Sequence, residues 1–182
     1  MKSIESRASS RSDWIRLQFG AALFVALALF ATGAFAAQLQ VGDSAPRLDI
    51  KLLDGRNLPA KALEGKVVLS MFWATWCPFC IADMPHMQRL HETYGARGLV
   101  ILAISLDRSR EDVVAYWDEH KYGFPVAMRS SAMREDYGAI RGTPTFFLAD
   151  RRGVVRMQHV GTPPEGALED RIKDLLGERA RP

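Results

Sequence analysis

The sequence predicts an α/β protein with a central mixed β-sheet and helices on both of its faces. Two continuous apolar runs, at residues 67–73 and 99–104, have the length and composition of strands that are buried on both faces. A helical pattern follows each run, over residues 78–94 and 110–120. This strand–helix order indicates parallel strands, and a hairpin signal nearer the carboxyl terminus adds antiparallel ones, so we expect a mixed sheet.

Turn signals organise the amino-terminal part of the domain. A short run of alternating apolar and polar residues at 47–52 lies beside the turn dipeptides Asp54-Gly55 and Glu64-Gly65. This pattern predicts an N-terminal hairpin extension. We expect one domain over residues 38–178, followed by a short tail at residues 179–182.

The second half of the domain carries an edge strand, a hairpin and a last helix. Residues 124–128 form an apolar run short enough for an edge strand. Two further runs, 145–149 and 154–157, flank an Asp-Arg-Arg-Gly turn and predict a hairpin. A last helix is expected over residues 167–176, where Gly177 ends it.

Residues 1–36 have the pattern of an export signal. Three arginines precede an uncharged apolar stretch at residues 20–30, and the small-x-small sequence Ala-Phe-Ala at 34–36 suits a signal peptidase. The alternative is an uncleaved membrane anchor, because residues 17–37 are 21 uncharged residues, enough to span a bilayer. Either form predicts a periplasmic or other extracytoplasmic domain, where disulfides persist.

The charge balance excludes one class of partner. Of the 24 basic and 21 acidic residues, four and two lie within residues 1–36, which leaves 20 against 19 in the domain. A domain this close to neutral has no electrostatic footprint for nucleic acid. We therefore expect no nucleic-acid partner.

Cys77 and Cys80 are the only cysteines in the chain, and they lie three residues apart. A disulfide that closes a four-residue loop stabilises a fold by about 2 kcal/mol, against about 4.7 kcal/mol for a hundred-residue loop. A pair that served only as a staple would lie farther apart in the chain. The Cys-x-x-Cys spacing therefore indicates redox chemistry.

The two cysteines are expected to differ in reactivity. Cys77 directly follows a buried strand and directly precedes a helix, so its sulfur should lie at a helix N-terminus. The positive end of the helix dipole and the free N–H groups of Phe79 and Cys80 favour a thiolate there, and Pro78 is well tolerated at the first helical position. We expect Cys77 to be the exposed, attacking thiol and Cys80 the buried, resolving one.

Asp83 is the second unusual residue. Cys80, Asp83, Met87, Leu90 and Tyr94 step by three and four residues, which is one face of a helix. A buried carboxyl one turn after Cys80 has a raised pKa and could act as general acid and base for that thiol. The other interpretation is a rim aspartate that points into water, and the residues alone leave both open.

Metal binding is the other common use of a Cys-x-x-Cys pair. His86 and His91 continue the helix that carries the cysteines, so they cannot fold back around a zinc ion. We expect neither a metal site nor a cofactor. A copper chaperone that binds Cu(I) through Cys77 and Cys80 is retained as an alternative, because thiolates suit that ion.

Together these residues resemble the thioredoxin superfamily, and most closely its extracytoplasmic TlpA/ResA-like branch. The resemblance is carried by Phe-Trp-Ala-Thr-Trp-Cys-x-x-Cys at residues 72–80, by Pro85 and by Gly-Thr-Pro-Thr-Phe at residues 142–146. It covers roughly residues 40–178 and implies a thioredoxin-like fold. It also implies that Pro144 is cis beside the cysteine pair.

The resemblance extends to the roles of single residues. In this branch an acidic residue lies three positions after the second cysteine, where this chain has Asp83. The backbone at Thr143 is implied to pair with an extended substrate segment. The substrate-binding residues are then expected to be Trp76, Pro78, Phe79, Thr143 and Pro144.

The function that the resemblance implies is thiol–disulfide exchange on exported proteins of the cell envelope. The expected direction is reduction, in the maturation of cytochrome c or of metal sites, with a membrane protein as electron donor. The partners are then protein thiols and disulfides.

Three departures from related patterns matter. Thioredoxin itself has a buried aspartate six residues before the first cysteine, where this chain has Met71. Members dedicated to cytochrome c maturation often have Pro-Glu, where this chain has Pro144-Thr145. Thiol peroxidases of the same architecture carry Thr or Ser three residues before the reactive cysteine, where this chain has Ala74, so a peroxidase is a minor alternative.

Overall fold

A computed structural model describes residues 38–177. The expected export signal or anchor, its cleavage site and the tail at residues 179–182 lie outside the described residues. Within residues 38–177, no helix combines the length and the apolar character needed to cross a membrane.

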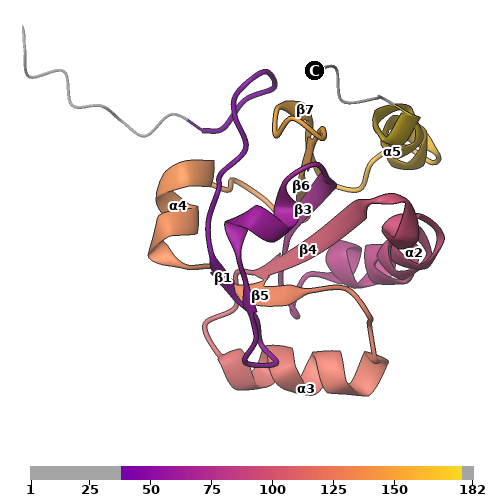
Figure 1. The fold of residues 1–182 in the computed structure, drawn as a ribbon. Coiled ribbons are helices and arrows are strands. Elements are labelled where there is room, and N and C mark those ends of the chain that lie inside the picture. Colours follow the sequence, from indigo (N-terminus) through magenta and orange to yellow (C-terminus); the bar gives the residue numbers. More distant parts are fainter. Residues whose placement is uncertain (1–37, 178–182) are drawn as a thin grey trace, which may run out of the picture. The chain divides into compact units, whose positions relative to one another are not determined.

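A five-stranded mixed sheet forms the centre of the domain, which confirms the predicted fold class (Figure 1). Its order is β5-β4-β3-β6-β7, in which β3, β4 and β5 run parallel and β6 and β7 are antiparallel to their neighbours. The strands are β3 Val67–Trp73, β4 Leu99–Ser105, β5 Val126–Met128, β6 Thr145–Ala149 and β7 Val155–Val160. The most apolar runs of the sequence, β3 and β4, are inner strands, as their composition requires.

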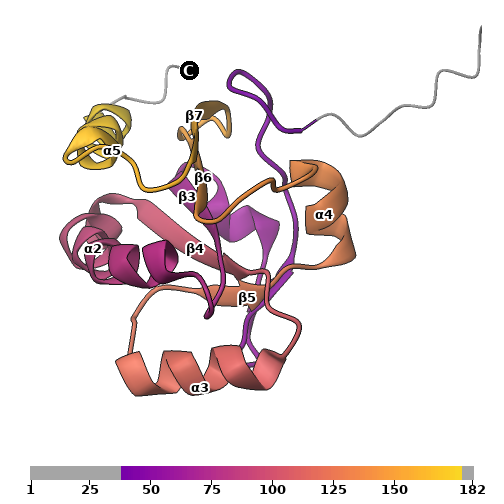
Figure 2. The same ribbon diagram turned by 180° about the vertical axis from the view of Figure 1, so that it is seen from behind.

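The helices lie on both faces of the sheet, as predicted. They are α2 Pro78–Tyr94, α3 Arg110–His120, α4 Ser131–Tyr137 and α5 Ala167–Gly177, with short 3-10 turns η1 Ala60–Leu63 and η2 Gly95–Arg97. Figures 1 and 2 show α2 and α5 on one side of the sheet and α4 on the other. A small hairpin of β1 Ile50–Lys51 and β2 Asn57–Leu58 confirms the predicted N-terminal extension.

Helix α4 was absent from the sequence prediction. It has only seven residues, which is too short for a clear periodic pattern. The Ser130 hydroxyl caps it by accepting a hydrogen bond from the Met133 backbone N–H at 3.1 Å. Its buried residues Met133 and Tyr137 pack in the core layer that contains Phe72 and Phe147.

Alternation along β3 divides the core into two layers. Leu69, Met71 and Trp73 point into the layer under α2, α3 and α5, which also contains both cysteines. Phe72 points into the other layer, with α4 and the N-terminal segment. The redox pair therefore belongs to one face of the sheet only, because successive side chains of a strand point to opposite faces.

Candidate active site

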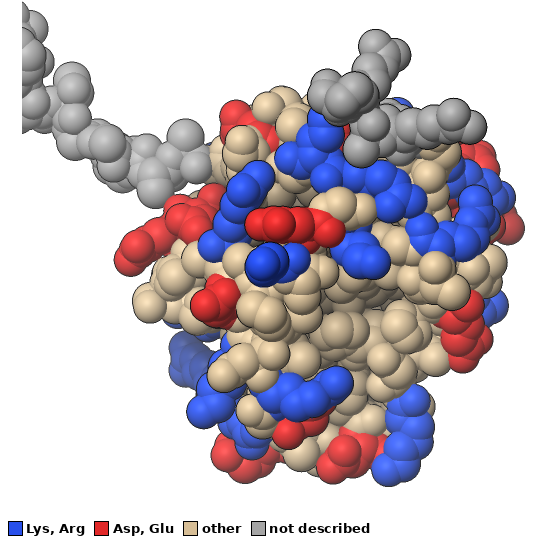
Figure 3. Space-filling view, in the orientation of Figure 1, with Lys and Arg blue, Asp and Glu red and all other residues tan. Residues whose placement is uncertain are grey.

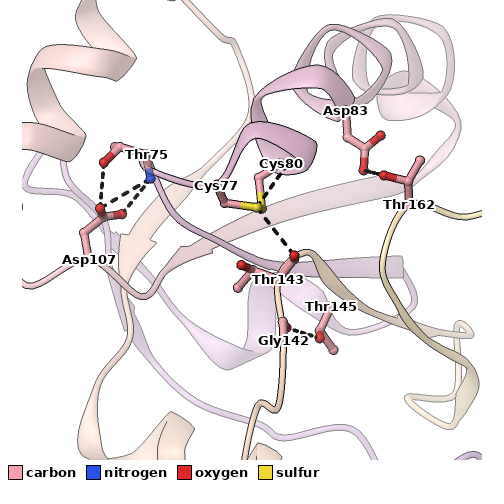
Figure 4. The surroundings of a disulfide bond; sticks show 9 residues. All are labelled: Thr75, Cys77, Cys80, Asp83, Asp107, Gly142, Thr143, Thr145 and Thr162. Atoms are coloured by element: carbon pink, nitrogen blue, oxygen red, sulfur yellow. Dashed lines mark hydrogen bonds between the residues drawn. A yellow bond between two sulfur atoms is a disulfide. The ribbon is translucent and has the colours of Figure 1, made fainter.

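Cys77 and Cys80 form a disulfide at the start of α2 (Figure 4). Cys77 is the N-cap residue of the helix, and Pro78 is its first helical residue. The Cys80 backbone N–H donates to Cys77 Sγ at 3.2 Å, so the sulfur occupies the place of a capping side chain. The predicted position of Cys77 at a helix N-terminus is confirmed.

The expected burial of the two sulfurs needs one correction. Cys80 is fully buried and Cys77 is 4% exposed, so their order is as expected. The expectation that Cys77 is exposed is wrong for the disulfide form. Its side chain belongs to the apolar core layer, and Sγ lies 3.5 Å from the Thr143 carbonyl oxygen of a neighbouring loop.

That loop contains the expected cis bond, between Thr143 and Pro144. Pro144 is buried, and its carbonyl accepts a hydrogen bond from the Gly161 N–H at 2.7 Å. The Thr145 hydroxyl donates to the Gly142 carbonyl at 2.6 Å and closes the loop on itself. The loop is thus held firmly against Cys77 from the side of β6 and β7.

Exposed aromatic side chains flank the disulfide. Trp76 is 69% exposed and Phe79 is 67% exposed, and Pro78 between them is also exposed. Among the described residues, Trp76 and Phe79 are the two aromatic side chains that are large, apolar and exposed. Large apolar groups left in water around a reactive disulfide suit a surface that docks another protein.

Asp83 is neither fully buried nor free in water. The buried side of α2 is formed by Cys80, Met84, Met87, Leu90 and Tyr94, and Asp83 is half-buried at its edge, between the buried carboxyl and the rim aspartate that the sequence left open. Residues three and four positions after Cys80 lie near the same face of the helix, so either Asp83 or Met84 could be buried there. Met84 is buried and Asp83 lies at the edge of the face, because full burial would remove the hydration of its carboxylate.

The environment of Asp83 makes its carboxyl a weaker acid than it is in water. Partial burial raises the pKa of Asp83, and the hydrogen bond from Thr162 and the nearby His86 offset only part of that rise. The Thr162 hydroxyl donates to Asp83 Oδ2 at 3.0 Å. The Asp83 carboxyl lies one helical turn after Cys80, on the side of the pair opposite to Asp107 in Figure 4.

Asp107 was missed by the sequence analysis. Its carboxylate accepts from the Thr75 hydroxyl at 2.7 Å, from the Thr75 backbone N–H at 3.1 Å and from the Ser105 hydroxyl at 2.8 Å. These bonds tie the loop before Cys77 to the end of β4. The available signal was an aspartate just after a buried strand, since adjacent parallel strands end at the same edge of a sheet.

The core beneath the disulfide is apolar. Met71 is fully buried in the same layer as both cysteines, so the position six residues before Cys77 carries no titratable group. Within residues 38–177, no three His, Cys, Asp or Glu side chains converge to hold a metal ion. Asp83 is therefore the titratable carboxyl that the α2 helix offers nearest to Cys80 in sequence.

Comparisons with known proteins agree with this geometry. Residues 41–158 match the AhpC/TSA family. The thiol-disulfide oxidoreductase ResA of Halalkalibacterium halodurans is 31% identical over 160 residues, which cover 86% of this chain and 91% of that protein. The thioredoxin-like protein YneN of Bacillus subtilis is 32% identical over 137 residues, which cover 74% of this chain and 79% of that protein.

A solved structure extends the likeness to the fold. The crystal structure of a protein from Chlorobium tepidum, described as a putative thiol:disulfide interchange protein DsbE, superposes with a TM-score of 0.70 and 34% sequence identity. The match covers 77% of this chain and 100% of that one.

Proposed function

The chain belongs to the AhpC/TSA family and is a thioredoxin-like thiol–disulfide oxidoreductase, and from that premise we propose that it reduces disulfides of exported proteins in the cell envelope. The reaction belongs to the maturation of cytochrome c or of metal sites. The single observation that carries the chemistry is the Cys77–Cys80 disulfide at the N-terminus of α2.

The reaction begins from the reduced pair. The Cys77 thiolate attacks one sulfur of a substrate disulfide, forms a mixed disulfide and expels the other substrate sulfur as a thiolate. Cys80 then loses its proton and attacks Cys77 Sγ, which restores the Cys77–Cys80 disulfide and releases the second substrate thiolate. Two electrons pass to the substrate, and a membrane electron donor returns two electrons to the enzyme.

Cys77 is the attacking sulfur because of its surroundings. The Cys80 N–H lies 3.2 Å from Cys77 Sγ and, with the dipole of a 17-residue helix, stabilises negative charge on that atom. Cys80 is fully buried, so a substrate reaches Cys77 first. The order of attack follows from access and from charge stabilisation together.

Asp83 takes the proton that Cys80 loses. Its pKa is raised chiefly by burial, which brings the carboxyl closer to the range in which it exchanges protons near neutral pH. Thr162 orients the carboxylate through its hydroxyl. Asp107 is a positioning residue, because it holds Thr75 two residues before Cys77 and touches no sulfur.

The substrate docks as an extended segment across Trp76, Pro78 and Phe79 and against the backbone at Thr143, which the buried Pro144 holds in place. The two exposed aromatic rings supply apolar contact area. The Thr143 carbonyl lies 3.5 Å from Cys77 Sγ, so a backbone that pairs with this loop brings its own cysteine to the attacking sulfur. An extended partner that uses main-chain hydrogen bonds fits this arrangement.

A peroxidase is less well supported. The residue three positions before Cys77 is Ala74, which is buried and has no hydroxyl to bind a peroxide. The adjacent Thr75 hydroxyl is already bonded to Asp107 at 2.7 Å.

A Cys80→Ser variant expressed in the native envelope tests the proposal. Without the resolving thiol, mixed disulfides between Cys77 and exported substrates should accumulate, and mass spectrometry of the trapped species names the substrates. The matched control is Cys77→Ser with Cys80→Ser, which should trap nothing. Equal trapping in both variants, or trapping of cytoplasmic proteins only, contradicts the proposal.

A further inference from the structure

A cavity of about 400 Å³ lies on the face of the sheet that does not carry the disulfide. It is enclosed by the N-terminal segment, η1, α4 and the turn between β6 and β7. Val68 and Ser70 of β3 line it, whereas Leu69 and Met71 of the same strand point toward the cysteine layer. The sheet therefore separates this cavity from the proposed redox site.

The floor of the cavity is apolar. Leu102, Phe147 and Val155 line it from the sheet, and all three are buried. The polar groups at the floor are the hydroxyls of Ser70 and Tyr137, which bond one another at 2.9 Å. A floor of this kind suits an alkyl chain. It has no free polar group that could bind a charged group of the ligand.

The wall and mouth of the cavity carry positive charge. Arg47, Lys66, Arg151 and Arg152 line it, together with the acidic Glu64 and Asp150. Figure 3 shows Lys and Arg side chains gathered over the upper part of one face of the domain, with an acidic side chain among them.

The acidic groups neutralise only part of this positive charge, because Asp150 pairs with Arg152 at 3.7 Å and with none of the other three cations that line the cavity. The carboxylate of Asp150 accepts hydrogen bonds from two backbone N–H groups and from Arg156, so its charge is already matched. Arg151 donates to three backbone carbonyl oxygens and to no carboxylate. Within residues 38–177, neither Arg47 nor Lys66 has an ion-pair partner.

We propose that this cavity binds an amphiphilic monoanion, a carboxylate on an unbranched alkyl chain of fatty-acid type. The chain fills the apolar floor, and the carboxylate meets Arg47 and Lys66 at the mouth. Glu64 at the same mouth repels a head group with two negative charges, which favours a carboxylate over a phosphate monoester. The volume lies in the range of small-molecule sites, roughly 300–1,000 Å³.

Decanoate, below its micellar concentration, is the probe for a calorimetric titration of the purified protein. We expect one saturable site whose affinity falls as salt concentration rises. Butyrate has the same head with a short chain, and 1-decanol has the same chain without the charge. Each should bind at least about tenfold more weakly.

A charge-reversal variant tests the mouth. Arg47→Glu with Lys66→Glu changes two exposed side chains outside the core and should weaken decanoate binding by about tenfold or more. Arg89→Glu with Lys121→Glu reverses two exposed cations that do not line the cavity, so it is the matched control and should leave the affinity unchanged. Insulin-disulfide reduction should be equal in all three proteins, which separates this site from the redox function.

Methyl NMR of the protein locates the alkyl chain of bound decanoate. Decanoate should shift the signals of Leu102 and Val155 at the cavity floor. Shifts confined to the surroundings of the exposed Trp76 and Phe79 overturn the proposal, because that patch is the competing apolar surface. Unsaturable binding, or equal affinity in the parent and the double variant, overturns it as well.

Discussion

Asp83 in α2 and Asp150 after β6 are both withdrawn from water, yet their surroundings shift their pKa values in opposite directions. For Asp150, burial alone would raise the pKa, but the backbone N–H of Val154, the Arg156 side chain and the backbone N–H of Arg152 outweigh it and lower the pKa. Asp83 has one neutral hydroxyl, that of Thr162, and burial prevails.

The comparison shows what decides the state of a carboxyl inside a protein. Asp150 has 1% of its side chain exposed and remains an anion because charged and backbone donors surround it. Asp83 is less buried but has fewer donors. A carboxyl that is fully supplied with donors stabilises the fold, whereas one that is undersupplied is free to exchange a proton.

The largest effect is expected from Asp150→Asn. The amide cannot accept from Arg156 as a carboxylate does, and it leaves a guanidinium without its counter-ion, so the free energy of unfolding should fall by about 3 kcal/mol. Urea denaturation measures this loss. Asp54→Asn removes an exposed ion pair with Arg56 and, as the control, should change the free energy of unfolding far less than Asp150→Asn does.

The same variant should reveal a pH dependence. Because the pKa of Asp150 is lowered from 3.8 by folding, its contribution is fully present above that value and is lost as pH falls through the lowered pKa. The stability difference between the parent and Asp150→Asn should therefore be constant at neutral pH and shrink in strong acid. A difference that grows in acid contradicts this account.

Asp83→Asn should affect rate and not stability. Loss of the proton acceptor should slow resolution of the mixed disulfide by about 100-fold at pH 7, the lower end of the usual general acid–base contribution. Stopped-flow release of substrate measures this step. Unfolding at pH 7 should become no easier, because the raised pKa means that the fold disfavours the Asp83 anion.

The matched variant Asp83→Glu keeps a carboxyl with one more methylene and should retain resolution within about tenfold of the parent rate. If Asp83→Asn and the parent resolve equally fast, water is the proton acceptor. In that case the raised pKa of Asp83 has no role in the reaction, and the contrast with Asp150 concerns the pKa values alone.

Asp107→Asn should have a smaller effect, because Asp107 acts on the sulfur through Thr75. The uncharged amide has one acceptor oxygen where the carboxylate has two, so it holds the Thr75 backbone N–H and hydroxyl more weakly. We expect alkylation of reduced Cys77 to slow by about tenfold, equivalent to about 1.4 kcal/mol. Thr75→Ser keeps the hydroxyl and should react at the parent rate.

The smallest effect is expected from Thr162→Val. It removes the hydrogen bond that lowers the pKa of Asp83, so that pKa should rise further. The limb of the pH–rate profile that belongs to Asp83 should move to higher pH, with a rate change at pH 7 of less than about tenfold. Thr162→Ser should restore the parent profile, and an unchanged limb in Thr162→Val assigns it to another group.

The sequence by itself determined the elements that rest on local patterns. The two long apolar runs became β3 and β4, and Cys77 lies at the N-terminus of α2 because a strand, a turn and a proline follow one another in the chain. The cis bond before Pro144 was expected only through resemblance, since local sequence gives most prolines a trans bond.

Only the tertiary structure decided which partner each carboxyl meets. Thr162 reaches Asp83 across 79 residues of sequence, and Asp107 reaches Thr75 across 32. The choice of Met84 over Asp83 for the buried face of α2, and the cavity behind β3, depend on how neighbouring elements fill space. Periodicity reports which side chains share a face, but packing and hydrogen bonds between distant segments decide burial, and burial sets the pKa.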